Sequence, residues 1–269
     1  MRGILCIIDR RRSMKFGAQL YSLRNFIKTE SDIDDTFAKV KAMGYDNVQF
    51  SGADFNAESL KKTIDKYDLP VNLTHIPAQR LLEETDKVIE DHKIIGCEYI
   101  GLGAMPHAFP FTGGLKEVDE FIADFEKIAK KINAAGLKFS YHHHDFEFRK
   151  LENDMTIFDY LAERAEHFMF TLDTYWLQRG GVSVLEYINK MKGRIDCVHL
   201  KDMMTVTEGG QKYAPLGVGV INFHDIIPAM EKAGAKYAFV EQDDAVTYPD
   251  PFGQMETSAN YLKDGGWLR

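Results

Sequence analysis

One pattern repeats eight times along the chain, and this repetition restricts the folds open to it. From Phe16 onward, short β-branched or aromatic runs alternate with longer segments of helical period, as expected for βα units and a parallel sheet. Because eight such units close into a barrel, the sequence predicts a single-domain α/β fold, the (β/α)8 TIM barrel. The predicted strands span residues 16–20, 47–50, 71–75, 99–102, 138–142, 168–172, 196–200 and 237–241.

The segments between the strands carry helix signals. Residues 32–43 place Ile33, Phe37 and Val40 near one face, and Ser31 is the predicted N-cap. A doubly wound open sheet is the alternative fold, but no GxGxxG motif follows the first strand. Five predicted strands are preceded by a glycine that can end a helix in the αL conformation: Gly44, Gly96, Gly136, Gly193 and Gly234.

Composition narrows the function. The chain has 269 residues, which suits one barrel, and a net charge of -8 from 33 basic and 41 acidic residues. Without a basic surplus to neutralise phosphates, nucleic acid is disfavoured as a partner. The three cysteines lie far apart, so they predict neither a disulfide framework nor a CxxC metal site, and a reducing, cytoplasmic compartment fits best.

The first residues do not resemble a targeting signal. The apolar run at residues 4–8 precedes three arginines and is too short for a signal peptide. No stretch approaches the roughly 20 apolar residues of a membrane helix, so no membrane association is expected. We expect residues 1–13 to form a poorly ordered extension and residues 14–269 to form the catalytic barrel. The sequence leaves open whether the barrel forms a homo-oligomer.

Residues that bind metal ions stand at the ends of four consecutive predicted strands. These are His142 in YHHHD, Asp173 in LDT, His199 in VHLKD and Glu241 in VEQD. Neighbouring barrel strands converge on one mouth, so the four side chains can surround one divalent ion such as Mn, Co, Zn or Mg. Unrelated rim residues are the simpler explanation for any one of them, but four in succession favour a metal site.

These motifs resemble the xylose isomerase-like barrels, which include sugar phosphate isomerases/epimerases, tagatose/psicose 3-epimerases, inosose dehydratases and endonuclease IV. The resemblance covers the chain from Met14 to its end. It rests on QLYSLR at residues 19–24, YHHHDFEF at 141–148, LDTYW at 172–176, VHLKD at 198–202, PLGVGVINF at 215–223 and FVEQD at 239–243.

The resemblance implies a ligand set with one departure. The epimerases hold their metal with Glu, Asp, His and Glu, and Asp173, His199 and Glu241 match the last three. His142 stands where those enzymes place the first glutamate, as inosose dehydratases also do. Glu147 lies five residues further on and is the alternative fourth ligand. We predict His142, because a strand residue is held more rigidly than a loop residue.

Three further groups are candidates for proton transfer. Lys201 lies two residues beyond His199 and shares its side of the strand, and a nearby dication would lower the pKa of its amine. His144 shares strand parity with His142 and is assigned to catalysis, whereas His143 faces away and is assigned a structural role. Glu147 and the ligand Glu241 complete the predicted catalytic set. The simpler explanation for Lys201 is a salt bridge to Asp202 or to a loop carboxylate.

Substrate contacts are predicted around the same mouth. Gln19 and Gln49 lie on the first two predicted strands, His75 ends the third, and Trp176 offers a flat wall for a sugar ring. Each is equally explained as a buried core residue. Gly217 and Gly219 precede a predicted helix, where their N–H groups could approach an anion, although a turn with Asn222 as N-cap also explains them.

The leading hypothesis is a metal-dependent isomerase or epimerase that acts on a small carbohydrate through an enediolate. The second is a keto-sugar dehydratase or 3-keto-glycoside lyase, favoured by His142 because elimination can run with one base and a separate acid. An endonuclease IV-like nuclease needs more ligands than these four strand ends supply, and the acidic balance opposes DNA. A barrel retained as a non-catalytic binding protein is the remaining alternative.

Overall fold

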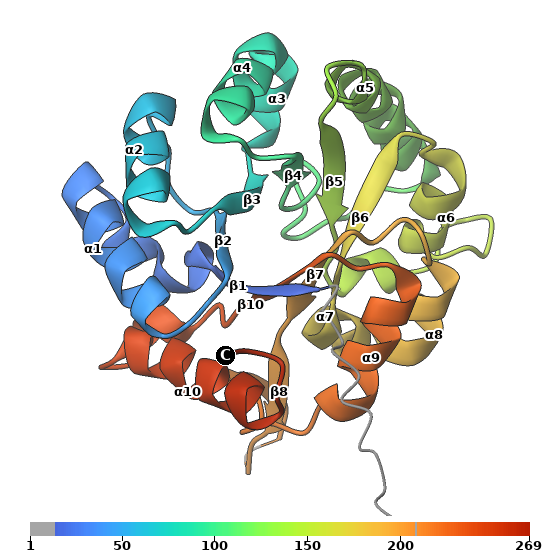
Figure 1. The fold of residues 1–269 in the computed structure, drawn as a ribbon. Helices are drawn as coiled ribbons and strands as arrows, with labels where there is room; N and C mark the ends of the chain where they lie inside the picture. Colours follow the sequence, from blue (N-terminus) through green and yellow to red (C-terminus); the bar gives the residue numbers. More distant parts are fainter. Residues whose placement is uncertain (1–13, 208) are drawn as a thin grey trace, which may run out of the picture.

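The computed structural model describes residues 14–207 and 209–269, so the extension predicted at residues 1–13 lies outside the described residues. Eight parallel strands form a closed barrel in the spatial order β1-β10-β7-β6-β5-β4-β3-β2 (Figure 1), which confirms the predicted fold. They are β1 (Lys15–Gln19), β2 (Asn47–Phe50), β3 (Val71–His75), β4 (Tyr99–Leu102), β5 (Lys138–His142), β6 (Phe168–Asp173), β7 (Cys197–Leu200) and β10 (Tyr237–Val240).

The predicted strands match the observed ones to within one residue at each end. Leu20, Asp196 and Glu241 were predicted inside strands but lie just outside them, and Asp173 ends β6. The sequence analysis did not predict the antiparallel hairpin of β8 (Asp202–Thr205) and β9 (Gln211–Ala214), which is inserted between β7 and the next helix.

Helices surround the barrel in chain order (Figure 1). The α-helices are α1 (Glu30–Ala42), α2 (Ala57–Tyr67), α3 (Ala78–Glu83), α4 (Thr85–Ile95), α5 (Leu115–Ala134), α6 (Ile157–Arg164), α7 (Thr174–Arg179), α8 (Val184–Lys190), α9 (Phe223–Ala233) and α10 (Pro251–Asp264), with 3-10 turns η1 (Leu20–Phe26), η2 (Phe146–Phe148) and η3 (Ala245–Thr247). Among the described residues, no helix combines the length and apolar character needed to cross a membrane.

The start of α1 corrects one prediction. Thr29, not Ser31, is the N-cap: its hydroxyl accepts a hydrogen bond from Asp32 N at 3.1 Å, and the Asp32 carboxylate accepts one from Thr29 N at 3.0 Å. This reciprocal capping box satisfies two N–H groups, which a cap at Ser31 would not do. The five predicted helix-ending glycines all have positive φ, which confirms that part of the pattern.

The barrel interior contains a small apolar cluster below its mouth. Leu73, Tyr99, Cys197 and Phe239 form this cluster, and all four are buried. Side chains on the outer faces of the strands pack against the helices in one large core. His142, Asp173, His199 and Glu241 lie at or near the C-terminal ends of their strands, the face that carries the active site in barrels of this type.

Candidate active site

Four side chains meet at the mouth of the barrel. His142 ends β5, Asp173 ends β6, His199 lies on β7 and Glu241 follows β10. One ligand atom from each lies within 4.8 Å of those of the other three, and all four residues are buried. The structure thus brings together the four residues predicted from the strand ends. The group contains His142 and not Glu147, the alternative ligand.

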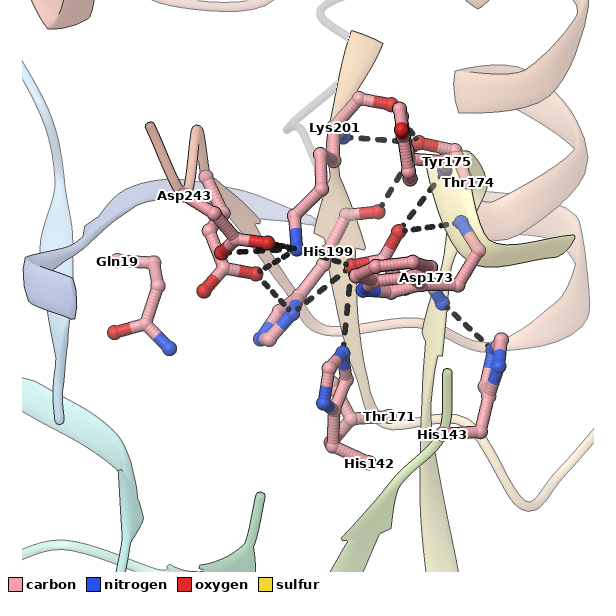
Figure 2. A network of polar contacts seen from close by, with 12 residues as sticks. Gln19, His142, His143, Thr171, Asp173, Thr174, Tyr175, His199, Lys201 and Asp243 are labelled. Carbon is pink, nitrogen blue, oxygen red and sulfur yellow. Dashed lines mark hydrogen bonds and ion pairs between the residues drawn. The ribbon is translucent and has the colours of Figure 1, made fainter. Parts of the chain in front are cut away.

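Asp173 divides its two carboxylate oxygens between two tasks. Oδ1 accepts hydrogen bonds from Tyr175 N at 2.9 Å and Trp176 N at 3.1 Å, which caps the start of α7 (Figure 2). Oδ2 faces His142 Nε2 at 3.3 Å and His199 Nδ1 at 3.4 Å. Because the cap fixes Oδ1, the carboxylate presents Oδ2 to the two imidazoles in a defined orientation.

Each imidazole is oriented by a bond on its other nitrogen. His199 Nε2 lies 2.7 Å from Gln49 Oε1, and the Gln49 amide is itself oriented because Nε2 donates to Ser51 Oγ at 3.2 Å. His142 Nδ1 lies 3.0 Å from the carbonyl of Gly103. Because both partners are acceptors, these nitrogens carry hydrogen, and the opposite nitrogen of each ring faces the carboxylates. This is the arrangement of metal-binding histidines.

The carboxylates of the group favour a positive charge at His199. His199 Nδ1 lies 3.0 Å from Glu241 Oε2. Burial alone would lower the pKa of His199, but Glu241 and Asp173 outweigh it and raise the pKa to about 9. A proton therefore occupies this position at neutral pH in the metal-free protein. Two imidazole nitrogens and two carboxylates form a donor set that can hold a divalent metal ion in its place.

Lys201 is an ammonium held by three carboxylates. Its Nζ lies 2.8 Å from Glu241 Oε2, 3.2 Å from Asp173 Oδ2 and 3.2 Å from Asp243 Oδ2. Burial alone would lower the pKa of this amine, but the three carboxylates hold it well above its usual value. In the metal-free site the amine is therefore protonated, and the lowering of its pKa beside a dication stays a prediction. Sequence analysis missed Asp243, although it lies two residues beyond Glu241, the same spacing that identified Lys201.

A cavity of about 550 Å³ opens beside this group. His75 and Trp176 line it, as predicted for substrate contacts, together with His144 and Lys201. Ile76, Pro77, Leu102 and Phe109 form an apolar wall. Gln19 and Gln49 were also predicted to contact substrate, but they are fully buried and are not among the residues that line the cavity. Gln49 instead orients His199, as described above.

Three buried polar atoms of the lining residues have no hydrogen-bond partner among the described residues. They are His75 Nε2, His144 Nδ1 and Trp176 Nε1. Burial, together with nearby positive charge, holds the pKa of His75 and of His144 well below the usual value, so both rings are neutral. Buried polar groups normally find a partner, so these three atoms are suited to contact a polar ligand.

Comparisons with known proteins place the chain in a family. A family model described as xylose isomerase-like TIM barrel matches residues 37–265. The chain belongs to the xylose isomerase-like TIM barrels. A search among curated proteins found no match.

Solved structures with the same fold include several sugar enzymes. A sugar phosphate isomerase/epimerase from Parabacteroides distasonis is 18% identical, with a TM-score of 0.79 over 100% of both chains. A probable 3-DHS dehydratase from Bacillus anthracis is 14% identical, with a TM-score of 0.71 over 93% of this chain and 99% of that one. A 3-keto-D-glucoside 4-epimerase from E. coli is 17% identical, with a TM-score of 0.68 over 93% and 99%. At these identities the likeness shows the fold.

In this xylose isomerase-like barrel, Glu147 is built into the loop after β5. It is fully buried, Oε1 accepts from Tyr141 Oη at 2.6 Å, and Oε2 accepts from His144 N at 2.8 Å. Burial raises the pKa of Glu147 to about 8. Its two oxygens are thus committed to holding the loop, and Glu147 is not part of the four-residue group.

His143 supports the same region from the opposite side. Its Nε2 accepts from Asp173 N at 3.1 Å, and its Nδ1 lies 3.0 Å from the carbonyl of His144 (Figure 2). Burial lowers the pKa of His143 to about 3, so the ring is neutral. Both nitrogens are used within the protein, which fits the structural role assigned from the sequence.

The two glycines of the PLGVGV segment at residues 215–220 donate their N–H groups to the side chain of Asp202. The Asp202 carboxylate accepts hydrogen bonds from Met203 N at 2.7 Å, Gly217 N at 2.9 Å, Gly219 N at 3.0 Å and Ile221 N at 3.1 Å. A Cβ on Gly219 would lie 2.3 Å from Asp202 Oδ1, so no larger residue fits there. Asp202 thus takes up N–H groups that the sequence suggested for a ligand, and it does not pair with Lys201.

Proposed function

We propose that this chain is a divalent-metal-dependent isomerase or epimerase that acts on a small sugar, a hydroxyketone or an aldose, through an enediolate. One observation carries the proposal: a buried group of two histidines and two carboxylates borders a cavity whose lining offers unpartnered polar atoms. The two imidazoles favour Mn, Co or Zn over Mg, which prefers oxygen ligands.

His142, Asp173, His199 and Glu241 would hold the metal. When bound, it supplies Lewis-acid stabilisation of the negative charge that develops on substrate oxygens. Glu241 supports this assignment electrostatically, because Lys201 and His199 hold the pKa of its carboxyl well below the usual value despite the opposing effect of burial. The carboxylate is therefore ionised and ready to bind a cation.

Proton transfer would use residues that border the cavity. His144 is neutral, so its unpartnered Nδ1 is free to accept a proton. Lys201 is charged, so it can donate a proton or stabilise an oxyanion. Glu241 is a second base candidate, because its carboxylate is ionised and lines the cavity. We assign catalysis to these three and now give Glu147 a positioning role.

Sugar positioning would use the remaining lining residues. The Trp176 ring lies 4.9 Å from the His144 ring and 5.2 Å from Lys201 Nζ, so a sugar bound on it would lie beside both groups. The centre of the His75 ring lies 5.3 Å from that of His142 and 5.7 Å from that of His199. The unpartnered Nε2 of His75 is therefore close to the proposed metal ligands.

A dehydratase or 3-keto-glycoside lyase is the second candidate. The group contains one glutamate, whereas symmetric epimerisation favours two carboxylate bases on opposite faces of the substrate. Elimination needs one base and a separate acid, and His144 and Lys201 can fill these two roles. The structural neighbours include both a probable dehydratase and an epimerase of 3-keto-glucosides. A nuclease is less supported, because the described residues contain a single cluster of four ligands.

One experiment tests the proposal and separates the two reactions. Protein stripped of metal and then loaded with Mn, Co, Zn or Mg would be incubated in D2O with free ketoses and with 3-keto-glucosides. Isomerase or epimerase activity predicts deuterium at the carbon beside the carbonyl and a new sugar, both detected by NMR. Lyase activity predicts release of the aglycone.

A His199→Ala variant is the control, since it keeps the cavity but lacks one ligand. Absence of exchange and of elimination with every metal, in protein shown to hold metal, would overturn the enzyme proposal and favour a binding protein.

A further inference from the structure

We propose that Arg24 binds an anionic group of the substrate, so that the sugar carries a carboxylate or a phosphate. This inference rests on the proposed function, because it takes the cavity as the sugar site. Arg24 lies on η1 and lines the cavity together with Tyr21, Ser51 and Gly52, on the side of β1 and β2. The metal-binding group was assigned from other strands, and Arg24 has no part in it.

The guanidinium of Arg24 is held in place before any ligand arrives. Nη1 donates to the carbonyl of Tyr21 at 2.9 Å and to the carbonyl of Asp243 at 2.8 Å, which ties η1 to the loop after β10. The guanidinium also lies 4.4 Å from the centre of the Tyr21 ring. Gly52, with φ of 92°, lets the loop after β2 approach, since a Cβ there would lie 3.0 Å from Arg24 Cβ.

The rest of this guanidinium is unused by the protein. Nε and Nη2 make no hydrogen bond within the described residues, and no carboxylate there lies within ion-pair distance of Arg24. Lys201, the other cation that lines the cavity, is already surrounded by three carboxylates. A fixed guanidinium with free N–H groups recognises the paired oxygens of a carboxylate or phosphate.

Two other places where an anion could bind at this end of the barrel are closed. The loop after β7 directs the N–H groups of Gly217 and Gly219 at Asp202, and the loop after β10 carries Asp243 and Asp244. Barrels commonly bind phosphate with these two loops. Here one is filled by a protein carboxylate, and the acidic loop after β10 is itself held by Arg24 through the Asp243 carbonyl, so the free N–H groups of Arg24 are left for an anionic substituent.

The test uses three sugars that differ at one carbon: D-fructose, D-fructose 6-phosphate and D-fructuronate. Their binding to Mn-loaded protein would be measured by isothermal titration calorimetry at low and high salt. We expect at least one anionic sugar to bind about tenfold or more tightly than fructose, with a preference that falls as salt rises. The anion that is preferred distinguishes a sugar phosphate from a sugar acid.

Arg24→Gln should abolish this preference, measured as the ratio of the affinities for the anionic sugar and for fructose. Arg164→Gln is the matched control, because Arg164 is exposed, also lies over a tyrosine ring (Tyr160, 5.6 Å) and does not line the cavity. Arg24→Lys keeps the charge without the planar fork and should retain only part of the preference. Circular dichroism would check that the variants fold.

Equal binding of the three sugars, failure of both anionic sugars to bind, or an unchanged preference in Arg24→Gln would each overturn the proposal. Failure of the proposed function is separately visible. In that case the Arg24-dependent preference would persist in protein that neither exchanges deuterium nor releases an aglycone.

Discussion

The two ends of the barrel contain the same kinds of charged residue in different proportions. At the N-terminal ends of the strands, here called the floor, Asp196 Oδ2 accepts from Tyr99 Oη at 2.7 Å, Lys138 Nζ at 2.6 Å and Lys236 Nζ at 3.0 Å. Burial alone would raise the pKa of Asp196, but these three donors outweigh it and lower the pKa. Glu98 Oε1 also lies 3.6 Å from Lys138 Nζ, so two carboxylates meet two ammonium groups and the charges balance within the chain.

At the mouth, three carboxylates share one ammonium. Asp173, Glu241 and Asp243 all contact Lys201, and His199 adds a second positive charge by keeping a proton. Buried charge without a sufficient internal partner is costly and is retained chiefly where function needs it. The floor is therefore a structural network, whereas the excess of carboxylates at the mouth supports the proposed cation site.

The largest expected effect is the loss of metal from the mouth and not from the floor. His199→Ala, Glu241→Ala and Asp173→Asn should each weaken metal binding by more than about a hundredfold, because loss of a supporting contact alone costs about 10–100-fold. Asn is chosen at Asp173 since Ala would also remove the cap of α7, at about 1 kcal/mol. Equilibrium dialysis with elemental analysis measures the metal.

Asp196→Asn is the matched control at the floor. It should keep full metal content and lose about 1–3 kcal/mol of stability in denaturant unfolding, because it breaks a buried charged network. Retention of stoichiometric metal by two of the three mouth variants would refute the ligand assignment.

A second expected effect is a strong pH dependence of metal affinity. The pKa of His199 is raised to about 9 in the metal-free protein, so below that pH a metal ion must displace its proton. Affinity should therefore rise about tenfold per pH unit toward pH 9 and level off above it. In the metal-free protein the same raised pKa contributes stability that is present below the ordinary pKa of 6.5 and lost as pH rises through 9.

Calorimetry in two buffers of different ionisation enthalpy would show one proton released per metal. Affinity that does not vary between pH 6 and 8 would contradict the assignment of His199 as a ligand that must lose a proton.

The smallest effect on the metal is expected for Glu147→Gln, which should leave metal content unchanged. Its effect is on stability: the pKa of Glu147 is raised from 4.5 to about 8, so the wild type loses stability as pH rises from about 4.5 to 8. The loss should be on the order of a few kcal/mol, and Gln should remove it. Denaturant unfolding of both proteins between pH 5 and 9 measures the difference.

His142→Ala tests which residue is the ligand from the β5 end, because it should lower metal affinity whereas Glu147→Gln should not. If metal content instead fell only in Glu147→Gln, the ligands would be Glu, Asp, His and Glu, and epimerisation would regain the lead over elimination.

The parts predicted from sequence are those that strand geometry determines. Consecutive parallel strands end at one mouth, so a histidine or carboxylate at each strand end is sufficient to bring His142, Asp173, His199 and Glu241 together. The same logic would have found Asp243, since it continues the spacing beyond Glu241.

The parts that sequence analysis missed depend on the paths of loops and on pairs distant in the chain. Glu147 bonds Tyr141 and the backbone of His144 within its loop, and this turn has no strand period to reveal it. Gln49 meets His199 from 150 residues away. Asp202 captures Gly217 and Gly219 only because β8 and β9 fold back as a hairpin. In each case the sequence shows the residue, but its hydrogen-bond partner depends on the folded path of the chain and could not be predicted.

The two roles of the Asp173 carboxylate also connect the proposed metal site to a tryptophan whose fluorescence can be measured. One oxygen binds the backbone N–H of Trp176 while the other faces the metal-binding histidines. The Trp176 indole borders the cavity, and the second of the two tryptophans, Trp267, packs against His224 at 5.0 Å outside the residues that line it. Changes in fluorescence on adding metal or sugar can therefore be assigned to Trp176, and occupancy of the site can be followed in real time without a label.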